Sequence, residues 1–234
     1  MNPKYSKWPI EDLATNEYLD AIICGLNLNS NNSVLAICGS GDQAFAMLEK
    51  TNNLHVVDMR EKQIEYFLYR KSLIERGEFG EFLIVSEEEM DKEDKNFVNA
   101  RNKYLTIKRL TKIRSNLEKG IEITNSKIEN LGRGKFDRIY LSNSLSYGGI
   151  YLDFLYIEKE LKKMTNLLKE NGLIYLSDYG EIFDNTSFIN NEEREKFLRK
   201  ISLRTNNELT KKAQRLQSKG WNYWIPGVLQ KIRN

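Results

Sequence analysis

Two glycines and an aspartate separate an apolar run from an apolar-periodic segment in the stretch VLAICGSGDQAFAML, which begins at Val34. Because Gly39 and Gly41 lack a Cβ atom, they permit unusual φ values and let a ligand come close to the main chain. Asp42 is well suited to cap the helix expected after them, and its charge would repel a pyrophosphate from the positive end of that helix. The loop therefore favours a ligand that carries an ammonium group and no phosphate.

A second chemical feature follows at Asp58, which ends the apolar run Leu54–Asp58. The glycine loop lacks both the third glycine of a dinucleotide fingerprint and the Gly-Lys-Ser/Thr of a P-loop. A carboxylate at a strand end can accept both hydroxyls of a ribose, although many such aspartates only cap a helix. A glycine loop with an acid about 15 to 20 residues later is the spacing expected for an adenosyl ligand. The two features together favour S-adenosylmethionine over NAD.

Four short, nearly all-apolar runs must position these residues, and such runs are typical of strands buried on both faces of a parallel sheet. They span residues 33–38, 54–58, 136–142 and 173–178, and a weaker fifth run starts at Ile121. Helical spacing of apolar residues follows Asp58 and Gly149, and the second helix is expected to end at Gly172. This alternation predicts an α/β fold with an open, mostly parallel doubly wound sheet.

The segment from about residue 86 to residue 120 does not fit a minimal α/β unit. It is strongly charged, yet its apolar residues form one stripe, which predicts one or two amphipathic helices inserted as a cap near the sheet edge. The stripe comprises Phe97, Ala100, Tyr104, Ile107, Leu110, Ile113 and Leu117. The basic residues of its second part are Arg101, Lys103, Lys108, Arg109, Lys112, Arg114 and Lys119. A solvated outer face explains them; the alternative is contact with nucleic acid or an anionic membrane.

The tail from Asn191 to Asn234 predicts a charged helix, a short strand-like run KISLRT and a second helix from Asn206. The final stretch WNYWIPGVLQKI is rich in strand-forming aromatic residues, and its Pro-Gly pair marks a turn or bulge. We expect this stretch to form a closing strand or hairpin on the edge of the sheet.

Composition narrows the class of protein. The 234 residues are 40% apolar with three prolines, which predicts one globular domain over residues 1–234. The near-balanced charge of +3 does not single out nucleic acid as a partner. Cys24, Cys38 and His55 are the only cysteines and histidine, so an ordinary Cys/His zinc site is excluded and no metal is expected. His55 lies inside an apolar run and is expected to be a strand residue with a satisfied ring.

The few cysteines are typical of a reducing compartment. The sequence shows no apolar window of roughly 20 residues and no signal-peptide pattern at its beginning. These patterns predict a cytoplasmic protein.

The stretch AICGSGDQAFAMLEKTNNLHVVDMREKQIEYFLYRKSL resembles the S-adenosylmethionine-binding core of the betaine-lipid synthase family of 3-amino-3-carboxypropyl transferases, which have a class I methyltransferase-like Rossmann fold. LSNSL at Leu141 resembles the fourth-strand motif of that family, and KWPIED near Trp8 its upstream segment. The resemblance covers residues 8–178 and is strongest over residues 35–73. This chain departs from the family where Met59-Arg60-Glu61 replaces Asn-Pro, and it is much shorter than the lipid-synthesising members.

The resemblance implies a set of cofactor contacts. Gly39, Ser40, Gly41 and Asp42 would hold the methionine moiety, Asp58 the ribose and Met59 one face of the adenine. Asn125 or Ser126 would lie near the adenine edge, and Ser142 and Asn143 would close the pocket below the sulfonium.

A sulfonium is already an activated leaving group, so catalysis is mainly the in-line positioning of acceptor and carbon. The motifs alone leave open which carbon is attacked. The resemblance favours transfer of the aminocarboxypropyl group to a small-molecule acceptor, with methyl transfer as the alternative. Tyr147 and Asp178 are candidates to orient or deprotonate the acceptor, although a packing aromatic and a turn-capping acid would look the same.

A third hypothesis is a non-catalytic module whose basic insert binds nucleic acid, with salt-dependent affinity. The sequence sets neither the acceptor nor the oligomeric state.

Overall fold

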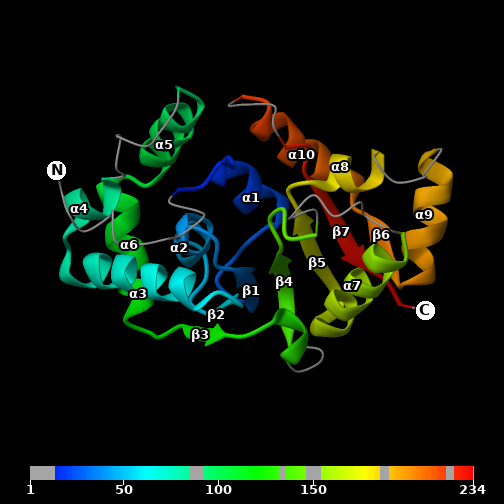
Figure 1. Ribbon diagram of the computed structural model, residues 1–234, viewed down its shortest axis with the longest axis horizontal. Coiled ribbons are helices and arrows are strands. Elements are labelled where there is room, and N and C mark those ends of the chain that lie inside the picture. The colour runs from blue at the N-terminus through cyan, green and yellow to red at the C-terminus, as the bar shows by residue number, and fades with distance from the viewer. Residues whose placement is uncertain are drawn as a thin grey trace.

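A seven-stranded sheet forms the centre of the computed structural model, which describes residues 14–84, 92–131, 135–145, 154–184, 190–219 and 224–233 (Figure 1). The strands are β1 (Val34–Ile37), β2 (Leu54–Asp58), β3 (Glu122–Asn125), β4 (Phe136–Tyr140), β5 (Leu168–Leu176), β6 (Leu203–Thr205) and β7 (Gly227–Lys231). Their order across the sheet is β3-β2-β1-β4-β5-β7-β6.

The pairing confirms the predicted fold class. The strands β1 to β5 are parallel to one another, whereas β7 runs antiparallel to both β5 and β6. The result is the predicted open, mostly parallel doubly wound α/β sheet. Its register pairs Ile37 with Val57 and Ala36 with Tyr140, so the loops after β1, β2 and β4 leave the sheet at the same edge.

Helices cover both faces of this sheet. They are α1 (Leu19–Gly25), α2 (Asp42–Leu48), α3 (Glu61–Arg76), α4 (Phe79–Leu83), α5 (Lys92–Tyr104), α6 (Ile107–Leu117), α7 (Phe154–Leu167), α8 (Tyr179–Asp184), α9 (Asn191–Lys200) and α10 (Asn207–Gln217). Strand side chains alternate between the faces, so Val34 and Ala36 pack with α1 to α6 and α10. Leu35 packs on the other face with α7, α8 and α9.

The predicted insert contains α5 and α6. Leu110, Ile113 and Leu117 are buried along α6, which packs against α2 and α3. Figure 1 shows both helices in the half of the molecule that holds α3 and α4. Two of the basic residues predicted for its outer face have internal partners instead: Arg101 is 1% exposed, and Arg109 is 2.8 Å from a carboxylate oxygen of Glu49.

The prediction that Gly172 ends a helix is wrong. The helix α7 ends at Leu167, and β5 begins at Leu168 with a register shift against β4. A Cβ at Gly172 would lie 2.9 Å from the carbonyl oxygen of Lys169 and 3.1 Å from that of Asp137. Glycine is needed here because the main chains of the irregular strand pair come too close for a side chain.

The prediction of a closing strand in the tail is correct in type and wrong in position. The strand β7 lies between β5 and β6, and β6 forms the edge of the sheet. A Cβ at Gly227 would lie 2.1 Å from Cγ of Tyr179. The pair predicted as a turn or bulge therefore starts β7 where it packs directly against α8.

Two further features bear on function. The connection from β3 to β4 is short, and its described residues contain one single-turn 3-10 helix, η2 (Ile128–Asn130). Within the described ranges, every helix is too short or too polar to cross a membrane.

Candidate functional site

A cavity of about 460 Å³ opens at the carboxyl ends of the central strands. Gly39 after β1, Asp58 and Met59 at the end of β2, and Ser142 and Asn143 after β4 contribute to its wall. The opposite wall comes from α7 and from the connection that contains η2. Ligands of open α/β sheets bind at this edge, and small-molecule sites occupy about 300 to 1,000 Å³. The cavity has the position and the size of a ligand site.

The glycine loop turns sharply beside this cavity. Gly39 and Gly41 have φ values of +47° and +83°, which residues with a side chain adopt only at a cost. A Cβ at Gly41 would lie 2.6 Å from Cδ2 of Phe67. The loop is fixed from outside, because Gln63 donates to the carbonyl oxygen of Gly39 and Arg70 donates to that of Ser40 over 2.6 Å.

Asp58 links the glycine loop to the cavity. Its Oδ2 accepts from the amide N–H of Gly39 over 3.3 Å, and its Oδ1 accepts from that of Arg60 over 2.9 Å. Burial raises the pKa of this carboxyl above 3.8, while the two amide N–H donors act in the opposite direction. The side chain therefore presents an acceptor that is already oriented on the cavity wall.

The residues expected near an adenine lie beside Asp58. Met59 is 66% exposed and forms part of the cavity wall. Ser126 also lines the cavity, and its amide N–H donates to the carbonyl oxygen of Asp58 over 2.9 Å. The side chain of Asn125 donates to the same carbonyl oxygen and is not among the residues of the wall. The structure thus brings Met59 and Ser126 to the cavity and leaves Asn125 outside it.

Asp42 does not face this cavity. Its side chain is 0% exposed, and Oδ1 accepts from Nη2 of Arg70 over 2.6 Å and from Nε of Arg101 over 2.7 Å. Its Oδ2 accepts from the amide of Thr15 over 3.0 Å. Burial would raise the pKa of Asp42, but the charges of Arg101 and Arg70 outweigh it and lower the pKa to about 2. Two guanidinium groups therefore hold the carboxylate that we expected to bind an ammonium group.

The other predicted residues have different surroundings. Ser40 is 1% exposed and donates to the carboxylate of Asp42 over 3.3 Å, so it also lies behind the loop. Asp178 is 0% exposed at the start of α8 and is not among the residues of the cavity wall. Tyr147 lies outside the described residues. His55, as expected, is a buried strand residue whose Nε2 is 2.9 Å from the hydroxyl of Thr124.

Sequence reasoning missed Glu17, which is 4% exposed and lies among the carboxyl ends of β4 and β5. Its Oε1 accepts from the hydroxyls of Tyr140 and, over 2.8 Å, Ser142. Its Oε2 accepts from the hydroxyl of Ser177. Burial is the main influence on its pKa and raises it above 4.5. Ser142, which has a positive φ of +53°, thus connects Glu17 to the wall of the large cavity.

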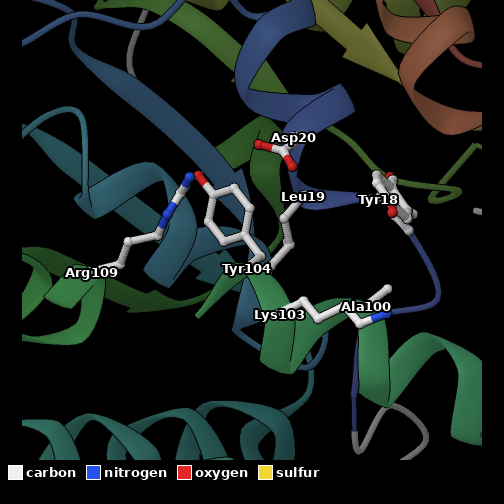
Figure 2. Close-up of a pocket in the computed structure, with 8 residues that line it drawn as sticks. Tyr18, Leu19, Asp20, Ala100, Lys103, Tyr104 and Arg109 are labelled. Atoms are coloured by element: carbon white, nitrogen blue, oxygen red, sulfur yellow. The ribbon is translucent and has the colours of Figure 1, made fainter. Parts of the chain in front are cut away.

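Glu17 also lines a second, smaller cavity of about 100 Å³. Figure 2 shows Tyr104 and Arg109 next to each other in its wall, with Asp20 beyond them. The guanidinium of Arg109 lies 3.9 Å from the centre of the Tyr104 ring, and both side chains donate to the carboxylate of Glu49. Glu17 therefore lines the small cavity and is hydrogen-bonded to Ser142, which lines the large one.

The strand order and the position of the large cavity together identify the architecture. The fold is the class I S-adenosylmethionine-dependent methyltransferase-like Rossmann fold. No protein-family model matches the chain, and no curated protein matches its sequence. The resemblance to the betaine-lipid synthase family is therefore without support from these comparisons.

Solved structures resemble the chain at low identity. N-methyltransferase NodS from Bradyrhizobium japonicum, in complex with S-adenosyl-L-homocysteine, is 12% identical with a TM-score of 0.48, covering 92% of this chain and 86% of its own. The ribosomal protein L11 methylase from Lactobacillus delbrueckii is 11% identical, with a TM-score of 0.47 and coverage of 92% and 79%. The [4+2]-cyclase SpnF is also 11% identical, with a TM-score of 0.47 and coverage of 92% and 80%. Similarity at this level concerns the fold alone.

Proposed function

We propose that this protein is an S-adenosylmethionine-dependent methyltransferase that acts on a small molecule. The observation that carries the proposal is the position of Asp58, which lies on the wall of the large cavity while it accepts a hydrogen bond from the glycine loop. The cavity fits the cofactor by three criteria: a main chain open to close approach at Gly39, an oriented acceptor for ribose hydroxyls, and sufficient volume.

Selected residues on the wall of the large cavity are each assigned to one part of the cofactor. Asp58 accepts the ribose hydroxyls, Met59 packs against the adenine, and Ser126 lies near the adenine edge. Of the glycine loop, Gly39 belongs to the wall, and its main chain lies beside the methionine moiety. Ser142 and Asn143 close the cavity near the sulfonium. Asp42 has no direct role in this assignment, because its carboxylate is occupied by Arg70 and Arg101.

The bound cofactor supplies a methyl group that is activated by a positively charged sulfur. The chain supplies mainly position, since holding two reactants in line contributes about 7 to 11 kcal/mol in favourable cases. The fixed glycine loop and the hydrogen bonds of Asp58 give the cavity a preformed geometry.

Aminocarboxypropyl transfer is the second candidate and rests on the resemblance of residues 35–73 alone. We place methyl transfer first because neither the family models nor the curated proteins support that resemblance. The two reactions leave different products: S-adenosylhomocysteine marks methyl transfer, and methylthioadenosine marks aminocarboxypropyl transfer. Chromatography of the nucleoside product after incubation with S-adenosylmethionine and small-molecule acceptors separates them.

A binding experiment with the cofactor product tests the proposal, because it does not require the identity of the acceptor. Calorimetric titration with S-adenosylhomocysteine should show saturable binding, and Asp58→Asn should weaken it about 10- to 100-fold, as expected for lost hydrogen bonds to a charged group. Glu61→Gln is the matched control, because this exposed acid is three positions away and does not line the cavity. The proposal fails if the wild-type protein does not bind the nucleoside, or if Asp58→Asn binds it unchanged. Salt-dependent binding of RNA or DNA without cofactor binding would instead support the non-catalytic module.

A further inference from the structure

Among the described residues, the carboxylate of Glu17 accepts hydrogen bonds from neutral groups. The hydroxyls of Tyr140, Ser142 and Ser177 donate to it, and the side chain of Gln43 contributes a further hydrogen bond. Burying a charge is costly unless an opposite charge compensates it. The hydrogen bonds orient the carboxylate, but they do not neutralise it.

Asp42 is a second buried acid in this protein, and it differs from Glu17 in its partners. Asp42 has two guanidinium groups within 2.7 Å, which lower its pKa. Glu17 is buried to a similar degree, yet burial raises its pKa. Among the described residues, no cation forms an ion pair with it. A buried carboxylate that is not paired with a cation of the described residues can bind a cation from solution or take up a proton.

Glu17 is connected to both cavities, to the small one directly and to the large one through Ser142. Glu17 lines the small cavity directly, and its wall also contains one further acid, Asp20, and two cations, Lys103 and Arg109 (Figure 2). Arg109 is paired with Glu49. The hydroxyl of Ser142, 2.8 Å from Oε1 of Glu17, belongs to a residue of the large cavity. A group bound at Glu17 is therefore one side chain away from the proposed cofactor site.

We propose that Glu17 binds the amino group of the acceptor and takes its proton, so that the acceptor is an amine. The methyl transfer to the amine rests on the proposed function, whereas the binding of the amine at Glu17 does not. In the reaction, the bound ammonium group first gives one proton to the Glu17 carboxylate, which frees the lone pair of the nitrogen. The nitrogen then forms a bond to the methyl carbon, the carbon–sulfur bond breaks with its electron pair remaining on sulfur, and the product leaves as a protonated N-methylated amine. A carboxyl with a raised pKa is better matched to this task near neutral pH than an ordinary glutamate.

Calorimetry with matched probes tests the amine site. Propylamine and benzylamine are titrated against propanol and benzyl alcohol, which have the same carbon skeletons, in the presence and absence of S-adenosylhomocysteine. At least one amine should bind about tenfold or more tightly than its alcohol, as expected for a charge-assisted contact. Equal binding of amines and alcohols, or no binding of either amine, overturns the proposal.

Variants separate this site from the cofactor site. Glu17→Gln should weaken amine binding about tenfold or more while S-adenosylhomocysteine still binds. Glu118→Gln replaces an exposed acid that directly follows α6; this control should bind both. Unchanged amine binding by Glu17→Gln overturns the amine site. Failure of the wild-type protein to bind S-adenosylhomocysteine, with selective amine binding intact, overturns the proposed function alone.

A measurement on the wild-type protein covers the case in which Glu17→Gln does not fold. Amine affinity should fall as the pH is lowered, because protonation of Glu17 removes the negative charge that binds the ammonium group. Asp20, Lys103 and Arg109 also line the small cavity, so the Asp20→Asn variant is measured in parallel and should show the same fall. The midpoint of this fall should lie above pH 4.5, in line with the direction of the pKa shift. Amine affinity that is constant with pH contradicts the role of Glu17.

Discussion

Nε of Arg101, on the inserted helix α5, lies 2.7 Å from Oδ1 of Asp42, the first residue after the glycine loop. The same guanidinium donates to the carbonyl oxygens of Phe82 and Leu83 at the end of α4. One side chain of the insert therefore joins the helix that follows β1 to the helix that follows α3. The insert is part of the support of the loop and not a separate appendage.

Replacing Arg101 should destabilise the whole domain. Arg101→Ala leaves a buried carboxylate with one of its two cations and should lower the free energy of unfolding by about 3 to 5 kcal/mol. Urea denaturation measures this change. Lys112→Ala, an exposed lysine of α6, should change it by less than about 0.5 kcal/mol. Equal effects of both substitutions would contradict the structural role of Arg101.

Asp42 should make the stability dependent on pH in the acid range. Its pKa in the folded protein is about 2, below the ordinary value of 3.8. A depressed folded-state pKa contributes stability that is present above about pH 4 and is lost as the pH falls to about 2, to a total of about 2 kcal/mol. The difference in the free energy of unfolding between wild type and Asp42→Asn should become smaller as the pH falls over this interval. A difference that stays constant would rule out the assigned ion pairs, and Asp20→Asn, an exposed acid, serves as the control.

Two glycines offer a matched test of the loop geometry. Gly41→Ala places a Cβ at a φ of +83° and 2.6 Å from the Phe67 ring, so it should destabilise the protein by more than the about 1 to 2 kcal/mol of a left-handed residue alone. Gly80→Ala, in α4 with no atom within 4 Å of the new Cβ, should be neutral or stabilise by up to about 1 kcal/mol. Thermal unfolding of both variants provides the comparison. The assigned loop conformation is wrong if Gly41→Ala is as stable as wild type.

Glu17 should have the opposite pH dependence to Asp42. Because burial raises its folded-state pKa, the stability contributed by its protonated form is present at low pH and is lost as the pH rises through that pKa. Glu17→Gln resembles the protonated side chain, so its stability relative to wild type should increase as the pH is raised from acid to neutral. Chemical denaturation at several pH values, without ligand, measures the trend. A decrease would show that a cation outside the described residues compensates Glu17.

Much of the fold follows from local patterns in the sequence. The runs at residues 33–38 and 54–58 contain β1 and β2, because strands buried on both faces need apolar residues at successive positions. Gly39, Asp58 and Ser142 share one cavity wall because they follow parallel strands that end at one edge. Gly172 misled the helix prediction, since a glycine required by a strand irregularity has the same local signature as a helix end.

The buried charges could not be predicted in the same way. Arg70 and Arg101 meet Asp42 across 28 and 59 residues of sequence, and Glu17 meets Ser177 across 160. Periodicity identifies which face of a helix is apolar, but it does not identify a cation that packs within that face. The pattern around Asp42 therefore predicts a ligand-binding acid, and no pattern singles out Glu17.

The brief 3-10 turn between β3 and β4 has a practical consequence for a nucleoside held as proposed. Its purine would border a loop around Ser126 and Ile128 instead of a packed helical wall. Bulky substituents on the purine ring would then extend toward solvent without displacing a helix. A resin that carries S-adenosylhomocysteine through a purine-attached linker should retain this protein, whereas attachment through the ribose oxygens, which Asp58 is assigned to hold, should not.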